Sequence, residues 1–145
     1  MFMGEYHPML DEKGRVAIPV KLRKAFGDDP GINRLVITHG FDKCIMAFRD
    51  EDWQDFVQNK LVPLSMSDPM NRKRMRFLLG GASDCELDRQ GRLMIPAHLI
   101  QYSQITKDTT ILGLYNRVEI WATEVYDQYK PDREALDSFA KELGF

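Results

Sequence analysis

The chain has 145 residues, 43% hydrophobic and 29% charged, a composition typical of a globular protein rather than a disordered or fibrous one. The formal net charge of −2 excludes a uniformly basic coat for nucleic acid, although a local basic patch is compatible with it. Two cysteines, Cys44 and Cys85, are too few for a disulfide framework. The first residues lack the features of a secretory signal, and no apolar run approaches the ~18 residues of a membrane span, so a cytoplasmic location is expected.

A turn and a short strand are the first elements that the sequence predicts. Asp11 and Gly14 occupy the first and fourth positions of a turn, where these residue types are favoured. Residues 15–18 are predicted to form a strand because they are rich in apolar and β-branched side chains. Pro19 suits the first position of a helix that Gly27 is predicted to end.

Two strands and a longer helix are predicted to follow. Residues 35–38 and 44–48 have the composition of strands, and the turn at 40–43 joins them. A helix is predicted to begin at Asp50 or Glu51, because the apolar residues after this point recur at helical spacing. These apolar residues are Trp53, Phe56, Val57 and Leu61.

Residues 67–81 are predicted to form a helix that links the two halves of the chain. Ser67 or Asp68 can cap its start, with Pro69 in the first turn, and Gly80 and Gly81 can stop it. Its basic residues are Arg72, Lys73, Arg74 and Arg76. Such a basic run is usually a solvated face, and contact with DNA or with a neighbouring subunit stays open as an alternative.

The second half of the chain repeats the first. Residues 11–26 and 88–103 align at an offset of 77, and six of the sixteen positions are identical. The identical pairs are Asp11/Asp88, Gly14/Gly91, Arg15/Arg92, Ile18/Ile95, Pro19/Pro96 and Leu22/Leu99. We therefore predict a first repeat at 1–66, the linking helix at 67–81, and a second repeat with a C-terminal helix at 82–145.

The C-terminal helix is expected after Pro131. Its apolar positions are Leu136, Phe139, Ala140 and Leu143. This amphipathic pattern predicts a solvated or packed helix rather than an anion-binding one, because acidic residues outnumber basic ones in this part of the chain.

The repeated motif, Asp-x-x-Gly-Arg-[Val/Leu]-x-Ile-Pro, has a physical rationale. Gly14 can supply the positive φ that a tight hairpin turn requires. Asp11 and Arg15 flank the turn, so the carboxylate can fix the direction of the guanidinium group by charge-assisted hydrogen bonds. The remaining guanidinium donors would project toward phosphate or guanine edges. An ion pair that only locks the turn is an equally weighted interpretation, and both interpretations can hold together.

These twin blocks resemble the MraZ family of bacterial transcriptional regulators. The segments Met3-Gly4-Glu5-Tyr6, His39-Gly40-Phe41-Asp42-Lys43-Cys44 and Glu119-Ile120-Trp121 are also similar to that family, so the resemblance covers about residues 1 to 140. The resemblance implies an α+β fold: a duplicated AbrB/SpoVT-like swapped-hairpin β-barrel unit with short helices, in two pseudo-two-fold repeats. It further implies a nucleoid-associated regulator, expected to be a repressor, of the division and cell-wall gene cluster that includes its own gene. The implied partners are double-stranded DNA with short direct repeats, and further copies of the chain in a ring-shaped homo-oligomer.

The same resemblance implies the residues of the DNA-binding site. Arg15 and Arg92 are the expected DNA contacts, and Asp11 and Asp88 are expected to orient them. Weaker phosphate contacts are expected from Lys13, Lys21, Arg23, Lys24 and Arg89.

The two repeats differ in charge. Residues 1–77 carry 13 basic and 11 acidic residues, whereas residues 78–145 carry 7 basic and 11 acidic ones. The first repeat is therefore expected to supply more of the phosphate attraction, and Arg15→Ala is expected to weaken binding more than Arg92→Ala.

Other functional classes have less support in the sequence. No cofactor or metal is expected, because the histidines and cysteines lack zinc-ligand spacing and no phosphate-binding loop occurs. An enzyme is not expected, because an arginine near Asp11 and another near Asp88 would keep each carboxyl ionised and poor as a general acid. An AbrB-like antitoxin or protein-interaction module is the main alternative, although the predicted C-terminal helix differs from a disordered antitoxin tail.

Several large apolar residues are predicted to be buried. Met46, Met75 and Met94 lie in periodic apolar segments and are expected in the core. Trp53 and Trp121 close their respective strand–helix units and are expected in the core or in an interface.

Overall fold

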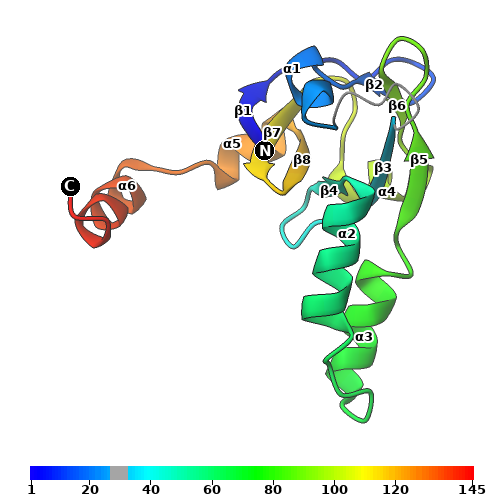
Figure 1. Ribbon diagram of the computed structural model, residues 1–145. Coiled ribbons are helices and arrows are strands. Elements are labelled where there is room, and N and C mark those ends of the chain that lie inside the picture. The colour runs from blue at the N-terminus through cyan, green and yellow to red at the C-terminus, as the bar shows by residue number, and fades with distance from the viewer. Residues whose placement is uncertain (27–32) are drawn as a thin grey trace.

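The computed structural model describes residues 1–26 and 33–145 as two antiparallel sheets with several short helices (Figure 1). The first elements are β1 (Phe2–Tyr6), β2 (Arg15–Ala17), α1 (Val20–Arg23), the 3₁₀ helix η1 (Lys24–Phe26), β3 (Arg34–His39), β4 (Ile45–Phe48), α2 (Asp50–Phe56) and the π-helical turn η2 (Val57–Leu61). The later elements are α3 (Pro69–Leu78), β5 (Ser83–Glu86), β6 (Arg92–Met94), α4 (Ala97–Ser103), β7 (Thr109–Tyr115), β8 (Arg117–Ala122), α5 (Thr123–Tyr129) and α6 (Arg133–Glu142). The expected helix end at Gly27 lies outside the described residues.

The helix starts show how local sequence decides the element boundaries. Pro19 is the residue before α1, with φ −54° and ψ 141°, and so precedes the helix by one position instead of beginning it. Asp68, and not Ser67, caps α3, because its carboxylate accepts a hydrogen bond of 2.9 Å from the backbone N–H of Met70. The helix predicted at Asp50 or Glu51 begins at Asp50, where acidic side chains in the first turn favour the helix dipole.

Strands from both halves of the chain are interleaved in one six-stranded sheet. Its order is β1-β7-β8-β4-β3-β5, and every neighbouring pair is antiparallel. The strands β4 and β8, one from each half of the chain, pair at the centre. β1 from the first half pairs with β7 from the second, whereas β5 from the second half pairs with β3 from the first. Each half therefore completes the sheet of the other.

The two faces of the sheet are covered by different elements. On one face, side chains such as Ile37 and Ile45 join a core with β2, β6, α1 and α4. On the other face, Val36 and Met46 pack with Trp53 in a second core beneath α2 and α3. This division follows from the strand period of two, which sends successive side chains to opposite faces.

The predictions of burial are confirmed for most of the large residues. Met46, Trp53 and Trp121 are buried, and Met75 is half-buried against the second core. The prediction for Met94 is wrong, because this side chain is 51% exposed. Met94 follows the buried Leu93 on a short strand, so it points to the opposite side.

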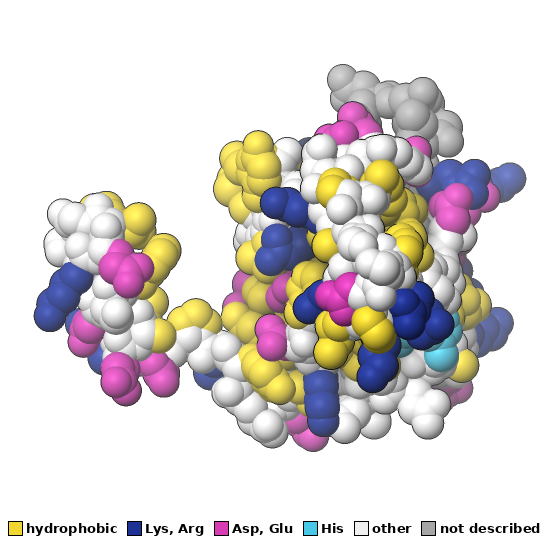
Figure 2. All heavy atoms as spheres, turned by 90° about the horizontal axis from the view of Figure 1, so that it is seen from below, with side chains coloured by type: hydrophobic (Ala, Val, Ile, Leu, Met, Phe, Trp, Pro, Cys, Tyr) yellow, Lys and Arg dark blue, Asp and Glu magenta, His cyan; other side chains and the backbone are white. Residues whose placement is uncertain are grey.

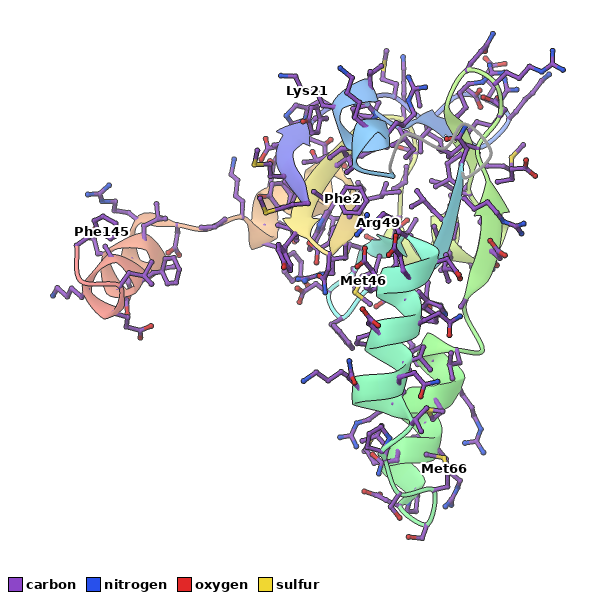
Figure 3. All side chains as sticks on the ribbon, viewed as in Figure 1. Phe2, Lys21, Met46, Arg49, Met66 and Phe145 are labelled. Atoms are coloured by element: carbon purple, nitrogen blue, oxygen red, sulfur yellow. The ribbon has the colours of Figure 1, made fainter. Side chains whose placement is uncertain are left out.

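The helices α2 and α3 form a hairpin that projects from the sheet, away from β2 and β6 (Figure 1). Met66 lies at the tip of this hairpin, whereas Lys21 lies at the other end of the molecule (Figure 3). The two ends therefore offer separate surfaces for binding.

The N-terminal strand is held by a contact with Arg49. Phe2 is buried, and the guanidinium carbon of Arg49 lies 5.9 Å from the centre of its ring. Figure 3 shows both residues beside the start of α2. Arg49 also donates to the Ala25 carbonyl at 3.0 Å and pairs with Asp52 at 2.7 Å. One side chain thus joins β1, η1 and α2.

The helix α6 stands apart from the rest of the protein (Figures 1 and 2). Every residue from 131 to 145 is exposed except Ala140, which is half-buried. The predicted helix is therefore confirmed, and its apolar face is packed against no other element of the described chain. No helix among the described residues is both long and apolar enough to cross a lipid bilayer.

Candidate nucleic-acid interface

The first Asp–Arg turn is held by one carboxylate. The Asp11 Oδ1 atom accepts hydrogen bonds of 2.9 Å from the backbone N–H groups of Lys13 and Arg15. The Oδ2 atom accepts a hydrogen bond of 2.7 Å from Arg15 Nε. The predicted pairing of Asp11 with Arg15 is therefore confirmed, and it leaves the two terminal nitrogens of Arg15 without a partner among the described residues.

The second turn repeats this arrangement. Asp88 Oδ1 accepts from the backbone N–H groups of Gln90 and Arg92, both at 2.9 Å. Asp88 Oδ2 accepts from Arg92 Nε at 2.6 Å. The side chain of Arg92 is 32% exposed, compared with 22% for Arg15, so both guanidinium groups are half-buried at their turns. Each carboxylate thus fixes the orientation of its arginine.

Both carboxyl groups are held in the charged form. The backbone N–H of Arg15 lowers the pKa of Asp11 most, and the side chain of Arg15 and the backbone of Lys13 lower it further against an opposing effect of burial. The backbone N–H of Arg92 is the main cause of the lowered pKa of Asp88. An ionised carboxylate that already accepts three hydrogen bonds is poorly suited to act as a general acid.

The two turns are joined by a short ribbon with distinct faces. β2 pairs with β6 so that Arg15 lies opposite Met94 and Ala17 lies opposite Arg92. Residues directly opposite in an antiparallel pair point to the same side, and so do alternate residues of one strand. Both arginines therefore share the outer face of the ribbon, while Val16 and the residue opposite it form the buried face.

Reciprocal backbone bonds fix one turn against the other. The N–H of Ile18 donates to the Gly91 carbonyl, and the N–H of Ile95 donates to the Gly14 carbonyl, both at 2.9 Å. Gly14 has a φ of +80° and Gly91 a φ of +75°, as the sequence predicted for these turn positions. The two arginines are thus carried by one rigid unit and not by two independent loops.

Arg23, a predicted phosphate contact, also has a structural role. Arg23 donates from Nε to the Ile18 carbonyl at 3.0 Å and lies directly over Gly91. The residue at the same place over Gly14 is Ile100, which aligns with Arg23 in the repeat. The guanidinium of Arg23 is therefore less available than an unengaged surface side chain.

The contact between Arg23 and Gly91 gives a testable difference between two matched glycines. A Cβ at position 91 would lie 2.6 Å from the Arg23 guanidinium, whereas the nearest atom to a Cβ at position 14 would belong to Ile100, at an ordinary contact distance of 3.5 Å. Both alanine variants should lose about 1–2 kcal/mol from the positive φ. Gly91→Ala should lose about 1 kcal/mol more, because Arg23 must release its hydrogen bond. Urea unfolding measures both values.

The double variant Gly91→Ala/Arg23→Ala provides the control. Once Arg23 is truncated, the alanine at position 91 should add no more destabilisation to the Arg23→Ala protein than Gly14→Ala adds to the wild type. An unchanged difference would show that the contact with Arg23 does not carry the effect.

The remaining predicted residues surround the ribbon. Lys13 and Arg89 are exposed on the two turns, and Lys21 and Lys24 are exposed on α1 and η1. Lys21 projects at the end of the molecule that carries β2 and β6 (Figures 1 and 3).

A further lysine at this site was missed in the sequence. The carbonyl of Lys107 accepts a hydrogen bond of 2.8 Å from the Leu10 N–H, and Lys107 lines a hollow together with Asp11 and Glu12. Lys107 is exposed beside the first turn. It belongs to no motif, and only the contact between distant segments brings it there.

The basic run of α3 is separate from the ribbon. Arg72 donates to the Met66 carbonyl at 2.9 Å, and Arg74 donates to Asn71 Oδ1 at 2.6 Å. Because the α2–α3 hairpin projects away from β2 and β6, these arginines cannot lie on the outer face of the ribbon (Figure 1).

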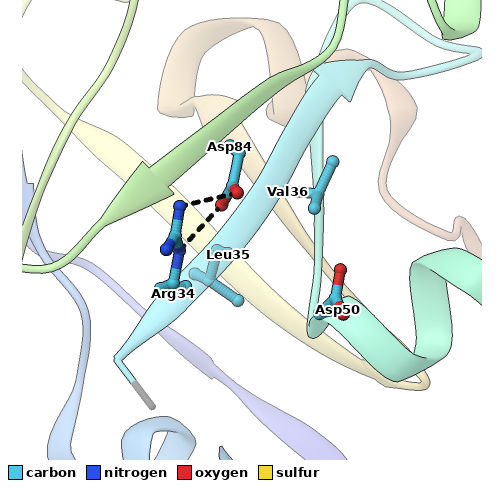
Figure 4. Close-up of a pocket in the computed structure, with 5 residues that line it drawn as sticks. All are labelled: Arg34, Leu35, Val36, Asp50 and Asp84. Atoms are coloured by element: carbon cyan, nitrogen blue, oxygen red, sulfur yellow. Dashed lines mark hydrogen bonds and ion pairs between the residues drawn. The ribbon is translucent and has the colours of Figure 1, made fainter. Parts of the chain in front are cut away.

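A second hollow, of about 240 Å³, lies beside β3 and is lined in part by Asp50 (Figure 4). Arg34 and Asp84 line it and are paired by two hydrogen bonds of 3.2 and 2.7 Å. This exposed ion pair joins β3 of the first half to β5 of the second. Within the described ranges, no three His, Cys, Asp or Glu side chains are grouped as a metal site would require.

Both halves of the chain match a known protein family. The model of the MraZ protein family, which is described as antitoxin-like, matches residues 1–76 and again residues 78–143. The chain belongs to the MraZ family. The transcriptional regulator MraZ of Natranaerobius thermophilus is 42% identical over 145 residues, which cover 99% of this chain and 96% of that protein. The resemblance found in the sequence is thus confirmed, and it indicates a regulator of transcription rather than an enzyme.

Proposed function

We propose that the chain regulates transcription by binding specific DNA sequences through the outer face of the β2–β6 ribbon. The observation that carries this proposal is that both turn arginines, Arg15 and Arg92, share that face and are each oriented by a carboxylate. A guanidinium group that is fixed at Nε still presents its terminal N–H groups to an acceptor. Guanine offers two acceptors in the major groove, which is wide enough to admit a two-stranded ribbon.

The charged side chains around the ribbon favour DNA over an uncharged ligand. Lys13, Lys21, Lys24 and Arg89 are exposed around the arginines, and they are suited to the phosphate backbone on either side of the base contacts. Phosphate contacts position a protein on DNA, whereas the two arginines would select the sequence. Lys107 is a further phosphate candidate beside the first turn.

The fold that we propose is a duplicated swapped-hairpin unit of the AbrB type, with a pseudo-two-fold axis between β4 and β8. The exchange of β1 and β5 between the halves supports it, as does the pairing of β2 with β6. In this proposal the first repeat is 1–66, the linking helix 67–81, and the second repeat 82–145.

We also infer the biological setting from the family. The chain acts as a repressor in the bacterial cytoplasm and nucleoid, on the promoter of the division and cell-wall gene cluster that includes its own gene. It assembles as a ring, so that several ribbons engage short direct repeats on one DNA molecule. Once one ribbon is bound, the others are held at high effective concentration near the DNA, so several weak contacts give strong binding. This gain offsets the electrostatic repulsion expected from the net charge of −2 on each chain.

DNA binding at the chain's own promoter tests this function. We expect the protein to shift a fragment from upstream of its gene at concentrations that leave a scrambled fragment of equal length unshifted. Affinity should fall by about 10³-fold or more between about 50 and 200 mM salt if six or more phosphates are contacted. Equal affinity for both fragments would overturn the proposed sequence specificity, and no shift at low salt would overturn DNA binding.

One observation favours a second candidate, a protein-interaction module of the antitoxin type. The apolar face of α6 is exposed, and the matching family model is described as antitoxin-like. In that case the promoter fragment would behave like the scrambled one, and α6 would bind a different protein instead of a copy of this chain.

A further inference from the structure

We infer that α6 docks in the apolar groove of the α2–α3 hairpin on a second copy of this chain. This inference rests on the self-association included in the proposed function. It adds the surfaces that make the contact, and it does not depend on how DNA is recognised.

The helix α6 carries a continuous apolar stripe. Leu136, Phe139 and Leu143 are 48%, 58% and 58% exposed, and Ala140 completes the stripe at helical spacing. Figure 2 shows hydrophobic side chains along one side of this helix and acidic ones elsewhere on it. An isolated ten-residue helix is marginal in water, so packing of its apolar face is needed to hold it in place.

The hairpin offers an apolar groove of suitable size. A hollow of about 520 Å³ is lined by Phe41, Phe56, Leu64 and Phe77, with Lys60 and Arg74 as its charged members. Phe41 is 70% exposed, so most of this large aromatic side chain faces solvent. Figure 2 looks toward this hairpin and shows hydrophobic side chains with Lys and Arg beside them.

The charges of the two surfaces are complementary. Residues 131–145 carry four acidic and two basic side chains, whereas residues 57–78 carry five basic and one acidic. Asp137 and Glu142 lie on either side of the apolar stripe, since helical residues are about 100° apart. They can therefore approach Lys60 and Arg74 while the stripe enters the groove.

A second copy fits these surfaces better than the chain's own groove. α6 follows α5 after only three residues, and it extends to a different side of the molecule from the hairpin (Figure 1). Each chain has one helix and one groove, so head-to-tail docking uses both on every subunit. Such a contact gives a closed ring when its rotation closes, and a filament when it does not.

Two single variants divide the contact into its halves. Phe139→Asp removes the helix stripe and keeps the groove, whereas Phe41→Asp charges the groove and keeps the helix. Each should raise the concentration at which the assembly dissociates by at least about thirtyfold, the effect of removing one interface hot spot. Phe145→Asp is the matched control, because Phe145 is 95% exposed and lies off the stripe, so its effect should stay within about twofold.

Mixing the two variants is the decisive measurement. Each is expected to be monomeric alone in sedimentation and light scattering, with the wild-type circular dichroism spectrum. Together they should form a 1:1 dimer, because one intact helix can meet one intact groove. A mixture of folded monomers that stays monomeric would overturn the inference, and so would a Phe139→Asp protein that keeps the wild-type mass.

The outcomes also separate this inference from the proposed ring. A wild-type assembly that is unaffected by Phe139→Asp contradicts the docking of α6 and leaves the ring intact. A monomeric wild-type protein contradicts both, with α6 then binding its own groove or a different protein. Promoter binding, measured in parallel, reports on DNA recognition independently.

Discussion

Replacing both turn arginines, Arg15→Ala with Arg92→Ala, should reduce specific affinity for promoter DNA at least about thirtyfold. A good bidentate contact to a base is worth about 1–3 kcal/mol, and the double variant removes two such contacts in each chain. The carboxylates of Asp11 and Asp88 retain their backbone hydrogen bonds, so both turns should stay folded. Gel shift or fluorescence anisotropy over a salt series measures the loss.

The single variants should differ. Arg15→Ala should weaken binding several-fold more than Arg92→Ala, because residues 1–77 carry 13 basic and 11 acidic residues, whereas residues 78–145 carry only 7 basic against 11 acidic ones. Equal losses, or a larger loss at Arg92, would contradict this difference between the repeats.

Two further variants test whether any loss of affinity comes from the turn arginines themselves and from the shape of their guanidinium groups. Lys73→Ala removes an exposed basic side chain on α3, in the hairpin that projects away from the ribbon (Figure 1), and should change affinity less than about twofold. A double change of both turn arginines to lysine keeps the charge but loses the planar fork, so non-specific binding should persist while sequence preference is lost. If the double alanine variant is folded and binds as the wild type does, the Asp–Arg pairs only lock their turns.

The chemistry of the turns could be predicted from sequence because it is local. Asp11 and Arg15 are four residues apart, and the turn that joins them is specified by Asp and Gly at defined positions. The same applies to Asp68 as a helix cap and to the acidic start of α2, both of which the structure confirms. Each of these features depends on neighbours within one turn of the chain.

The pairing between halves could not be predicted in this way. A repeat of sequence shows that two units are similar, but not that β1 pairs with β7 instead of with its own half. Lys107 reaches the first turn only through this long-range packing. Arg23 similarly meets Gly91 because α1 packs beside the turn of the other repeat. Such contacts depend on tertiary packing, which local propensity does not specify.

Met94 was misplaced for a related reason. Leu93, Met94 and Ile95 are all apolar, so the sequence gives no sign that Met94 differs from its two buried neighbours and is exposed to solvent. A strand of three residues is too short to show an alternating pattern by itself. Its register is set by pairing with β2 and by the core beneath.

Leu93→Ala should lower the free energy of unfolding by about 2–5 kcal/mol, the usual cost of truncating a fully buried leucine. Leu93 is completely buried and packs in the main core together with Val16 and Ile37. Met94→Ala, on the same strand and one residue later, should change stability by less than about 0.5 kcal/mol, because half of this side chain is already in water. Urea unfolding of the two variants gives both values under the same conditions.

This pair of variants also tests the geometry on which the proposed DNA contact depends. A shift of one residue in the pairing of β6 with β2 would turn the side chains of β6 to the opposite face. Met94 and Arg92 are alternate residues of β6, so any register that buries Met94 also turns Arg92 toward the core. If Met94→Ala costs more stability than Leu93→Ala, Arg92 cannot be a DNA contact. If Leu93→Ala costs more, and Met94→Ala weakens DNA binding by a few-fold at unchanged stability, the outer face of the ribbon is the surface that meets DNA.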